Sequence, residues 1–128
     1  MGTSSYKSFQ IGQIFSGRLN RGPFLVFSLA SLVFAPLNFL ETQNMLYQVL
    51  VLAAVIPMTV LSIGVTVRRM HDCGQSAWWL LLFLVPLANL VYYIYLFFKP
   101  SVKGTNKYGP EPSYERPLVE TILNRQPA

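Results

Sequence analysis

The sequence predicts an all-α membrane protein in which three hydrophobic helical segments form a single domain, residues 1–128. The first observation is the length of its apolar runs, Pro23–Leu40, Leu46–Val67 and Ala77–Phe98, which hold 18 to 22 residues each. Wound as helices, such runs rise about 27–33 Å and match a hydrocarbon core of about 30 Å. The second observation is charge, because only 12% of the residues are charged. Soluble proteins carry about 25%.

Residues 1–22 precede the first run and are expected to form a short interfacial helix. Four apolar residues recur there at helical spacing: Ile11, Ile14, Phe15 and Leu19. This pattern favours a helix in the lipid headgroup layer, with Arg18 and Arg21 at the level of the phosphates. A leader without regular structure is the alternative.

Each apolar run has one proline well inside it: Pro36, Pro57 or Pro86. An interior proline frees a carbonyl that a neighbouring helix or hydroxyl must satisfy, so we expect kinked helices that contact one another or a second copy. Gln48 and Asn89 are amides within the second and third runs. Each is expected to face another helix, with an ion or substrate path as the alternative.

Two arrangements fit the third run: a straight helix kinked at Pro86, or a re-entrant hairpin with its tip at Val85–Leu87. The straight helix places five bases on each side of the membrane, whereas the positive-inside rule expects an imbalance. The hairpin returns the tail to the cytoplasmic side with every base and leaves only the loop around Glu41 outside. Its cost is irregular backbone at membrane depth, which is tolerated only where protein covers it. That cost favours the straight helix.

After Phe98 the chain becomes a basic, proline-rich tail, residues 99–128. It carries five prolines: Pro100, Pro110, Pro112, Pro117 and Pro127. This composition predicts an extended tail and not a second domain. Within it, Leu118–Leu123 is expected to form a brief helical turn on the membrane surface.

The net charge of +5 lies outside the apolar runs. Bases at such positions contact anionic headgroups, at about 1 kcal/mol each, and no nucleic-acid-binding motif accompanies them. We therefore expect lipid partners and no nucleic acid. Arg68 and Arg69 are expected to reach phosphates at the end of the second helix. Trp78 and Trp79 open the third run as part of an interfacial aromatic belt.

The joint at residues 68–79 holds most of the chemically versatile side chains. His71 and Asp72 could act as an acid–base pair, but they are adjacent, and one histidine with one carboxylate falls short of a metal site. The favoured interpretation is structural: Asp72 pairs with a neighbouring arginine or caps the third helix, for which Ser76 is the better N-cap. Cys73 is the only cysteine, which excludes an intramolecular disulfide, and we expect an inert thiol. No cofactor or metal is expected.

Three motifs resemble a bacterial inner-membrane family called domain of unknown function 805. The joint supplies Arg69, His71, Asp72, Gly74, Ser76, Trp78 and Trp79. The tail supplies Asn106-Lys107-Tyr108-Gly109-Pro110-Glu111-Pro112. The start of the first run supplies Gly17, Arg18, Arg21 and Phe24. The resemblance covers about residues 15–112 and implies a small integral protein of the bacterial cytoplasmic membrane, for which the family has no established biochemical activity.

The tail motif predicts a turn in which Gly109 adopts an unusual backbone angle. We hypothesise that Tyr108 docks this turn against the His71 segment. A single site built from all three motifs requires that they share one face, which the hairpin permits and the straight helix forbids.

The favoured function is a non-enzymatic accessory or regulatory subunit that binds a protein partner or anionic lipid and self-associates or joins a larger membrane protein. The candidate lipid- or partner-binding residues are Arg18, Arg21, Arg68, Arg69, His71, Asp72, Trp78, Trp79, Asn106, Tyr108 and Gly109. One alternative is an oligomeric channel or transporter component that uses Gln48 and Asn89. The others are a membrane-interface enzyme that uses His71 and Asp72, and a small immunity-type protein that blocks a membrane toxin.

Overall fold

The structure, a computed structural model, describes residues 10–36, 43–112 and 118–124. The elements in these residues are η1 (Ile11–Phe15), α1 (Arg21–Phe34), α2 (Met45–Asp72), η3 (Ala77–Leu84), α3 (Pro86–Phe98) and α4 (Leu118–Ile122). All six are helical, and this part of the chain contains no strand. The all-α prediction is therefore confirmed for the described residues.

The boundaries of α2 follow from capping residues in the sequence. At its start, the Asn44 side chain accepts a hydrogen bond from the Tyr47 N–H at 3.2 Å, as a good N-cap does. At its end, Gly74 has a φ of +78°, which lets the Gln75 N–H donate to the Met70 carbonyl at 2.8 Å. The 28 residues of α2 extend about 42 Å.

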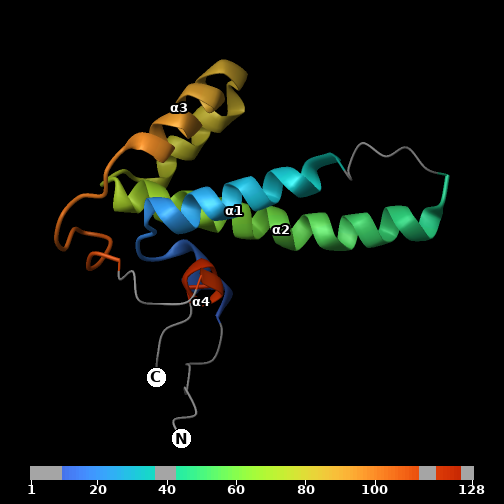
Figure 1. The fold of residues 1–128 in the computed structure, drawn as a ribbon, viewed down its shortest axis with the longest axis horizontal. Coiled ribbons are helices and arrows are strands. Elements are labelled where there is room, and N and C mark those ends of the chain that lie inside the picture. The colour runs from blue at the N-terminus through green and yellow to red at the C-terminus, as the bar shows by residue number, and fades with distance from the viewer. Residues whose placement is uncertain (1–9, 37–42, 113–117, 125–128) are drawn as a thin grey trace, which may run out of the picture.

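Among the described helices, α2 alone is long and apolar enough to cross a membrane. It lies antiparallel beside α1, and the two form the α1–α2 arm (Figure 1). Three spanning helices are therefore not confirmed, because α1 ends at Phe34 after 14 residues and residues 37–40 lie outside the described residues. The proline kinks are not confirmed either: Pro36 follows α1 and Pro86 begins α3, so only Pro57 lies inside a described helix.

The third apolar run forms a hairpin, and the straight kinked helix favoured from the sequence is wrong. Val85 has an extended backbone (φ −101°, ψ 114°) and separates η3 from α3. Pro86 takes the first position of α3, where its missing N–H removes no helical hydrogen bond. η3 and α3 pack side by side. The chain then returns to its starting point, where the Val102 N–H donates to the Asp72 carbonyl at 3.0 Å.

The apolar core lies where the α1–α2 arm meets the η3–α3 hairpin. Its buried members are Leu19, Phe24, Phe27, Val65, Met70, Cys73, Tyr92 and Leu96. Farther out the helices are bare: Leu32 of α1, Leu50 of α2 and Leu87 of α3 are 68%, 60% and 79% exposed. The fold therefore buries the apolar side chains near this junction and leaves those farther along α1, α2 and α3 exposed.

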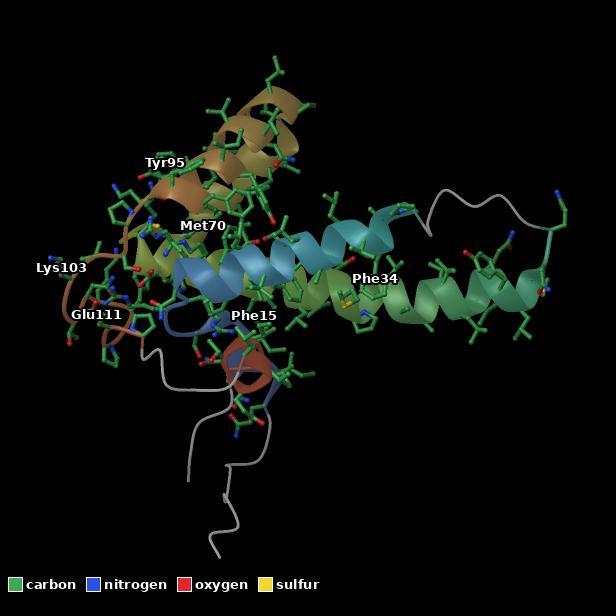
Figure 2. The ribbon with its side chains drawn as sticks, viewed as in Figure 1. Phe15, Phe34, Met70, Tyr95, Lys103 and Glu111 are labelled. Atoms are coloured by element: carbon green, nitrogen blue, oxygen red, sulfur yellow. The ribbon has the colours of Figure 1, made fainter. Side chains whose placement is uncertain are left out.

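The polar segments gather at one end, which we call the polar base (residues 10–20, 68–76, 99–112 and 118–124). Figure 2 shows Lys103 and Glu111 at the end of the molecule where Met70 lies, with Phe34 farther along the arm. The predicted helical turn in the tail is confirmed as α4, which packs against α1. The tail therefore folds back onto the rest of the protein.

The leader packs on α2 and does not form a separate interfacial helix. η1 is a five-residue 3₁₀ helix whose Ile14 is buried. It approaches α2 at Gly64, where a Cβ atom would stand 2.1 Å from Ile14 Cγ2. Only glycine leaves room for this contact. Residues 1–9 lie outside the described residues.

Candidate functional site

Asp72 lies between two arginines at the centre of the polar base. Its Oδ2 is 2.5 Å from Arg69 Nη1, three residues earlier on the same face of α2. Its Oδ1 is 3.0 Å from Arg18 Nη2, which comes from the leader. All three side chains are fully buried, and the Ser101 hydroxyl also donates to Oδ2. We call this group the Arg18–Asp72–Arg69 cluster.

Arg18 binds the tail through backbone carbonyls. Its guanidinium donates to the carbonyls of Val102, Gly104 and Gly109 as well as to Asp72. Gly104 has a φ of +73°, a conformation that side chains disfavour. One leader arginine therefore holds the loop that follows α3.

Arg69 binds the end of α3 in the same manner. Its Nε donates to the Leu96 carbonyl at 2.9 Å, and its Nη2 donates to the Lys99 carbonyl. The last carbonyls of a helix have no partner within the helix and attract cations. Arg69 satisfies two carbonyls at this end of α3 and fixes the returning arm of the hairpin against α2.

Arg68 completes the set by holding α4. Its Nη atoms donate to the carbonyls of Thr121 and Ile122 at the end of that helix. Asn124 follows with a φ of +53°, and its Nδ2 donates to the Ser16 carbonyl at 2.9 Å. Sequence reasoning missed these tail residues. The available signal was an asparagine directly after the predicted turn Leu118–Leu123, because asparagine often ends a helix in this conformation.

The arginines predicted at headgroup level are therefore inside the protein, with one exception. Counted over the whole residue, backbone included, Arg68 and Arg69 are 0% exposed and Arg18 is 6% exposed. Burying such charges is costly unless each is paired and hydrogen-bonded, and the carbonyls with Asp72 provide that compensation. Arg21 is the exception, because it is exposed and donates to the Phe98 carbonyl at 3.4 Å.

His71 joins the leader, α2 and the tail. Its Nδ1 lies 3.1 Å from the Gly17 carbonyl, and its ring stacks on Tyr108. The Asn106 side chain donates to the His71 carbonyl at 2.9 Å. The hypothesis that the tail turn docks on this segment is confirmed, and the φ of +133° at Gly109 confirms the unusual angle in that turn.

His71 and Asp72 do not form an acid–base pair in this arrangement. The His71 ring contacts Gly17 and Tyr108, whereas the Asp72 carboxylate contacts arginines. The described residues contain no group of three or more His, Cys, Asp and Glu that could hold a metal ion. Cys73 is buried, and that burial raises the pKa of its thiol above the ordinary value.

The remaining predicted residues lie around this core or away from it. Ser76 is the N-cap of η3, as predicted, and accepts from the Trp78 N–H at 3.3 Å. The indoles of Trp78 and Trp79 are exposed. Gln48 and Asn89 lie on different arms, in α2 and α3, and are not brought into the cluster. The structure thus unites the three sequence motifs and leaves Gln48 and Asn89, the two amides of the apolar runs, outside them.

Apart from Glu111 and Pro112, the residues of the three motifs lie within a segment that matches a family model. Residues 13–110 match the family described as Protein of unknown function (DUF805). The chain belongs to this family. The resemblance identified from the motifs is therefore confirmed, and the DUF805 segment includes the whole Arg18–Asp72–Arg69 cluster with its Tyr108 turn.

Two relatives extend the DUF805 comparison. The chain is 32% identical over 109 residues to "Inner membrane protein YhaI" of Escherichia coli (strain K12), covering 78% of this chain and 86% of YhaI. It is 40% identical over 52 residues to "Inner membrane protein YhaH" of the same strain, covering 41% of this chain and 43% of YhaH. The chain therefore aligns with less than half the length of YhaH. No solved structure matches.

Proposed function

We propose that this DUF805 protein is a non-enzymatic accessory or regulatory subunit of the bacterial inner membrane that binds a protein partner within the bilayer. The length of α2 supports the membrane placement, as does its exposure: only 17% of its most apolar 18-residue window is buried inside the protein. A soluble protein buries such a helix. The relatives YhaH and YhaI are named as inner membrane proteins.

The proposed orientation places the polar base in the cytoplasm. All described lysines and arginines lie in or beside the polar base. They are Arg18, Arg21, Arg68, Arg69, Lys99, Lys103 and Lys107. Positively charged segments remain on the cytoplasmic side of inner-membrane proteins. Because the η3–α3 hairpin reverses the chain, a single orientation puts every described lysine and arginine on the cytoplasmic side.

One observation carries the non-enzymatic proposal: the polar groups of the cluster form hydrogen bonds with other parts of the same chain. All three guanidinium nitrogens of Arg18 and of Arg69 donate within the protein. Both oxygens of Asp72 accept. Catalysis requires groups free to meet a substrate. The cluster instead acts as a clamp that fastens the leader and tail to α2.

A groove between α1 and α2 favours a protein partner over lipid alone. It holds about 420 Å³. Its small or short side chains include Ser31, Ala35, Ala54, Thr59 and Ser62. Such residues permit close approach of a second membrane helix. The hydroxyls of Ser31, Thr59 and Ser62 donate hydrogen bonds to carbonyls of their own helices at 2.7–2.8 Å. They therefore need no hydrogen-bond partner from an apolar helix that packs against them.

Photocrosslinking in native membranes tests this proposal with a matched pair of positions. Ala54 lines the groove and its neighbour Ala53 does not. A photoreactive residue in place of Ala54 should yield one discrete adduct with another inner-membrane protein, whereas the same residue at Ala53 should yield mainly lipid adducts. The adduct should recur when the identified partner carries the probe. Lipid adducts alone at both positions would favour a lipid-anchoring role and contradict a protein partner.

A further inference from the structure

The tip of the η3–α3 hairpin is uncovered at a depth where membrane proteins cover their backbone. Leu84 and Leu87 are each 79% exposed, and Val85 between them is extended. From the polar base, η3 rises about 16 Å and α3 about 20 Å. Both fall short of a hydrocarbon core of about 30 Å, so the tip ends inside it. Irregular backbone at that depth occurs only where other protein buries it.

Asn89 adds an unpaired polar group close to this tip. It lies one turn into α3 and lines a shallow hollow with Pro86, Leu90 and Tyr93. Its side-chain amide makes no hydrogen bond with any described residue. In hydrocarbon an amide without a partner is unfavourable, and such side chains bond across helix interfaces.

The face of α3 that carries Asn89 is the face that packs on α1 nearer the base. The Tyr93 hydroxyl donates to Ser28 Oγ at 2.7 Å, and the Phe97 ring centroid is 5.3 Å from that of Phe24. Positions 89, 93 and 97 recur every four residues and therefore share one side of the helix. Toward its tip the hairpin diverges from the α1–α2 arm (Figure 1), and Leu90 near the tip is 61% exposed.

We infer that the chain self-associates through this surface, the Asn89 face (Pro86, Asn89, Leu90 and Tyr93), with Asn89 of one copy against Asn89 of a second copy. An amide is both donor and acceptor, so two copies related by a twofold axis can exchange two hydrogen bonds. Both copies enter the membrane from the same side, which sets their amides at the same depth. A lipid chain offers no such partner. The inference rests on the membrane placement proposed above.

Disulfide crosslinking in native membranes tests the Asn89 face. Leu90→Cys in a full-length Cys73→Ala background should form a covalent dimer on mild oxidation, whereas Leu29→Cys, exposed on α1, should not. Asn89→Leu added to Leu90→Cys should lower the association constant on the order of tenfold, because it removes both interhelical bonds. Asn89→Gln preserves the amide and should retain much of the dimer.

Each contrary result has a separate meaning. Equal crosslinking at Leu90→Cys and Leu29→Cys, or no response to Asn89→Leu, would overturn self-association through this face. A crosslink from Leu90→Cys to a different protein would also overturn it, while leaving the proposed accessory role intact. Labelling of Leu90→Cys by a membrane-impermeant maleimide would place the hairpin in water, and then the membrane placement would fail together with the inference.

Discussion

The rings of His71 and Tyr108 stack face to face, with centroids 3.9 Å apart and planes within 4° of parallel. His71 stands in the last turn of α2, and Tyr108 belongs to the tail, 37 positions later in the sequence. The same turn is tied to α2 by the bond from Asn106 to the His71 carbonyl. The stack therefore fastens the tail motif to the joint motif.

Replacing Tyr108 should loosen the tail measurably. Tyr108→Ala is expected to lower the free energy of unfolding by about 1–2 kcal/mol, because it removes the stack and half-buried ring area. Tyr108→Phe keeps the ring and should cost less. A double-mutant cycle with His71→Ala in bicelles measures the coupling, expected at about 0.5–1.5 kcal/mol. Additive losses would show that the two rings do not interact.

Removing the Asp72 charge should be far more damaging. Asp72→Asn leaves the buried guanidiniums of Arg18 and Arg69 without a counter-charge, and breaking such pairs costs about 3–5 kcal/mol. The free energy of unfolding in bicelles is the measurement. Lys103→Gln changes an exposed charge and should stay within about 0.5 kcal/mol of the parent. A folded, equally stable Asp72→Asn protein would contradict the clamp.

The parts of the fold that the sequence predicted are those set by local chemistry. Ser76 caps η3 because a hydroxyl can accept from the next turn, and Gly109 turns because glycine tolerates its φ. The position of α2 follows from a long uncharged and largely apolar run, Leu46–Val67. Each of these features depends on neighbours a few positions away.

The parts that were missed depend on distant segments. Whether Arg69 reaches lipid or the interior is decided by the Leu96 and Lys99 carbonyls, about 30 positions later. The sequence favours the straight helix over the hairpin because irregular backbone at the hairpin tip is unfavourable in lipid, an argument that treats the chain as isolated. The structure has the hairpin nonetheless, since its return brings those carbonyls to Arg69. The polar contacts at the base thus decide how an apolar run folds.

The contact between the leader and α2 has little room. Gly64→Ala should displace η1, since the added Cβ would stand 2.1 Å from Ile14 Cγ2 and 2.9 Å from the Ile14 carbonyl oxygen. Limited proteolysis of the leader should be faster in this variant. Gly22→Ala meets nothing within 4 Å and is the matched control. Adding Ile14→Ala removes the closer clash and should restore part of the protection. An unchanged cleavage rate in Gly64→Ala would argue against this packing.

Cys73 should be unreactive in the folded protein. It is 6% exposed, and burial raises the pKa of its thiol, so both access and the thiolate fraction are low. At pH 8 a maleimide should label the parent far more slowly than a Lys103→Cys, Cys73→Ala variant, whose thiol is exposed. Unfolding in detergent should abolish the difference. Rapid labelling of the folded parent would contradict a closed core at the end of α2.

The location of the carboxyl end tests the whole arrangement. Reporters fused after Ala128, one active only in the cytoplasm and one only outside, should both report the cytoplasm, because the leader, joint and tail motifs share the polar base. Inserted after Glu41, between α1 and α2, the reporter that works only outside the cytoplasm should be active. This insertion is the positive control for that reporter. External activity after Ala128 would mean that the η3–α3 segment crosses the bilayer. Arg18 and Arg69 could not then bind the tail carbonyls, since the two arginines and the tail would lie on opposite sides of the membrane.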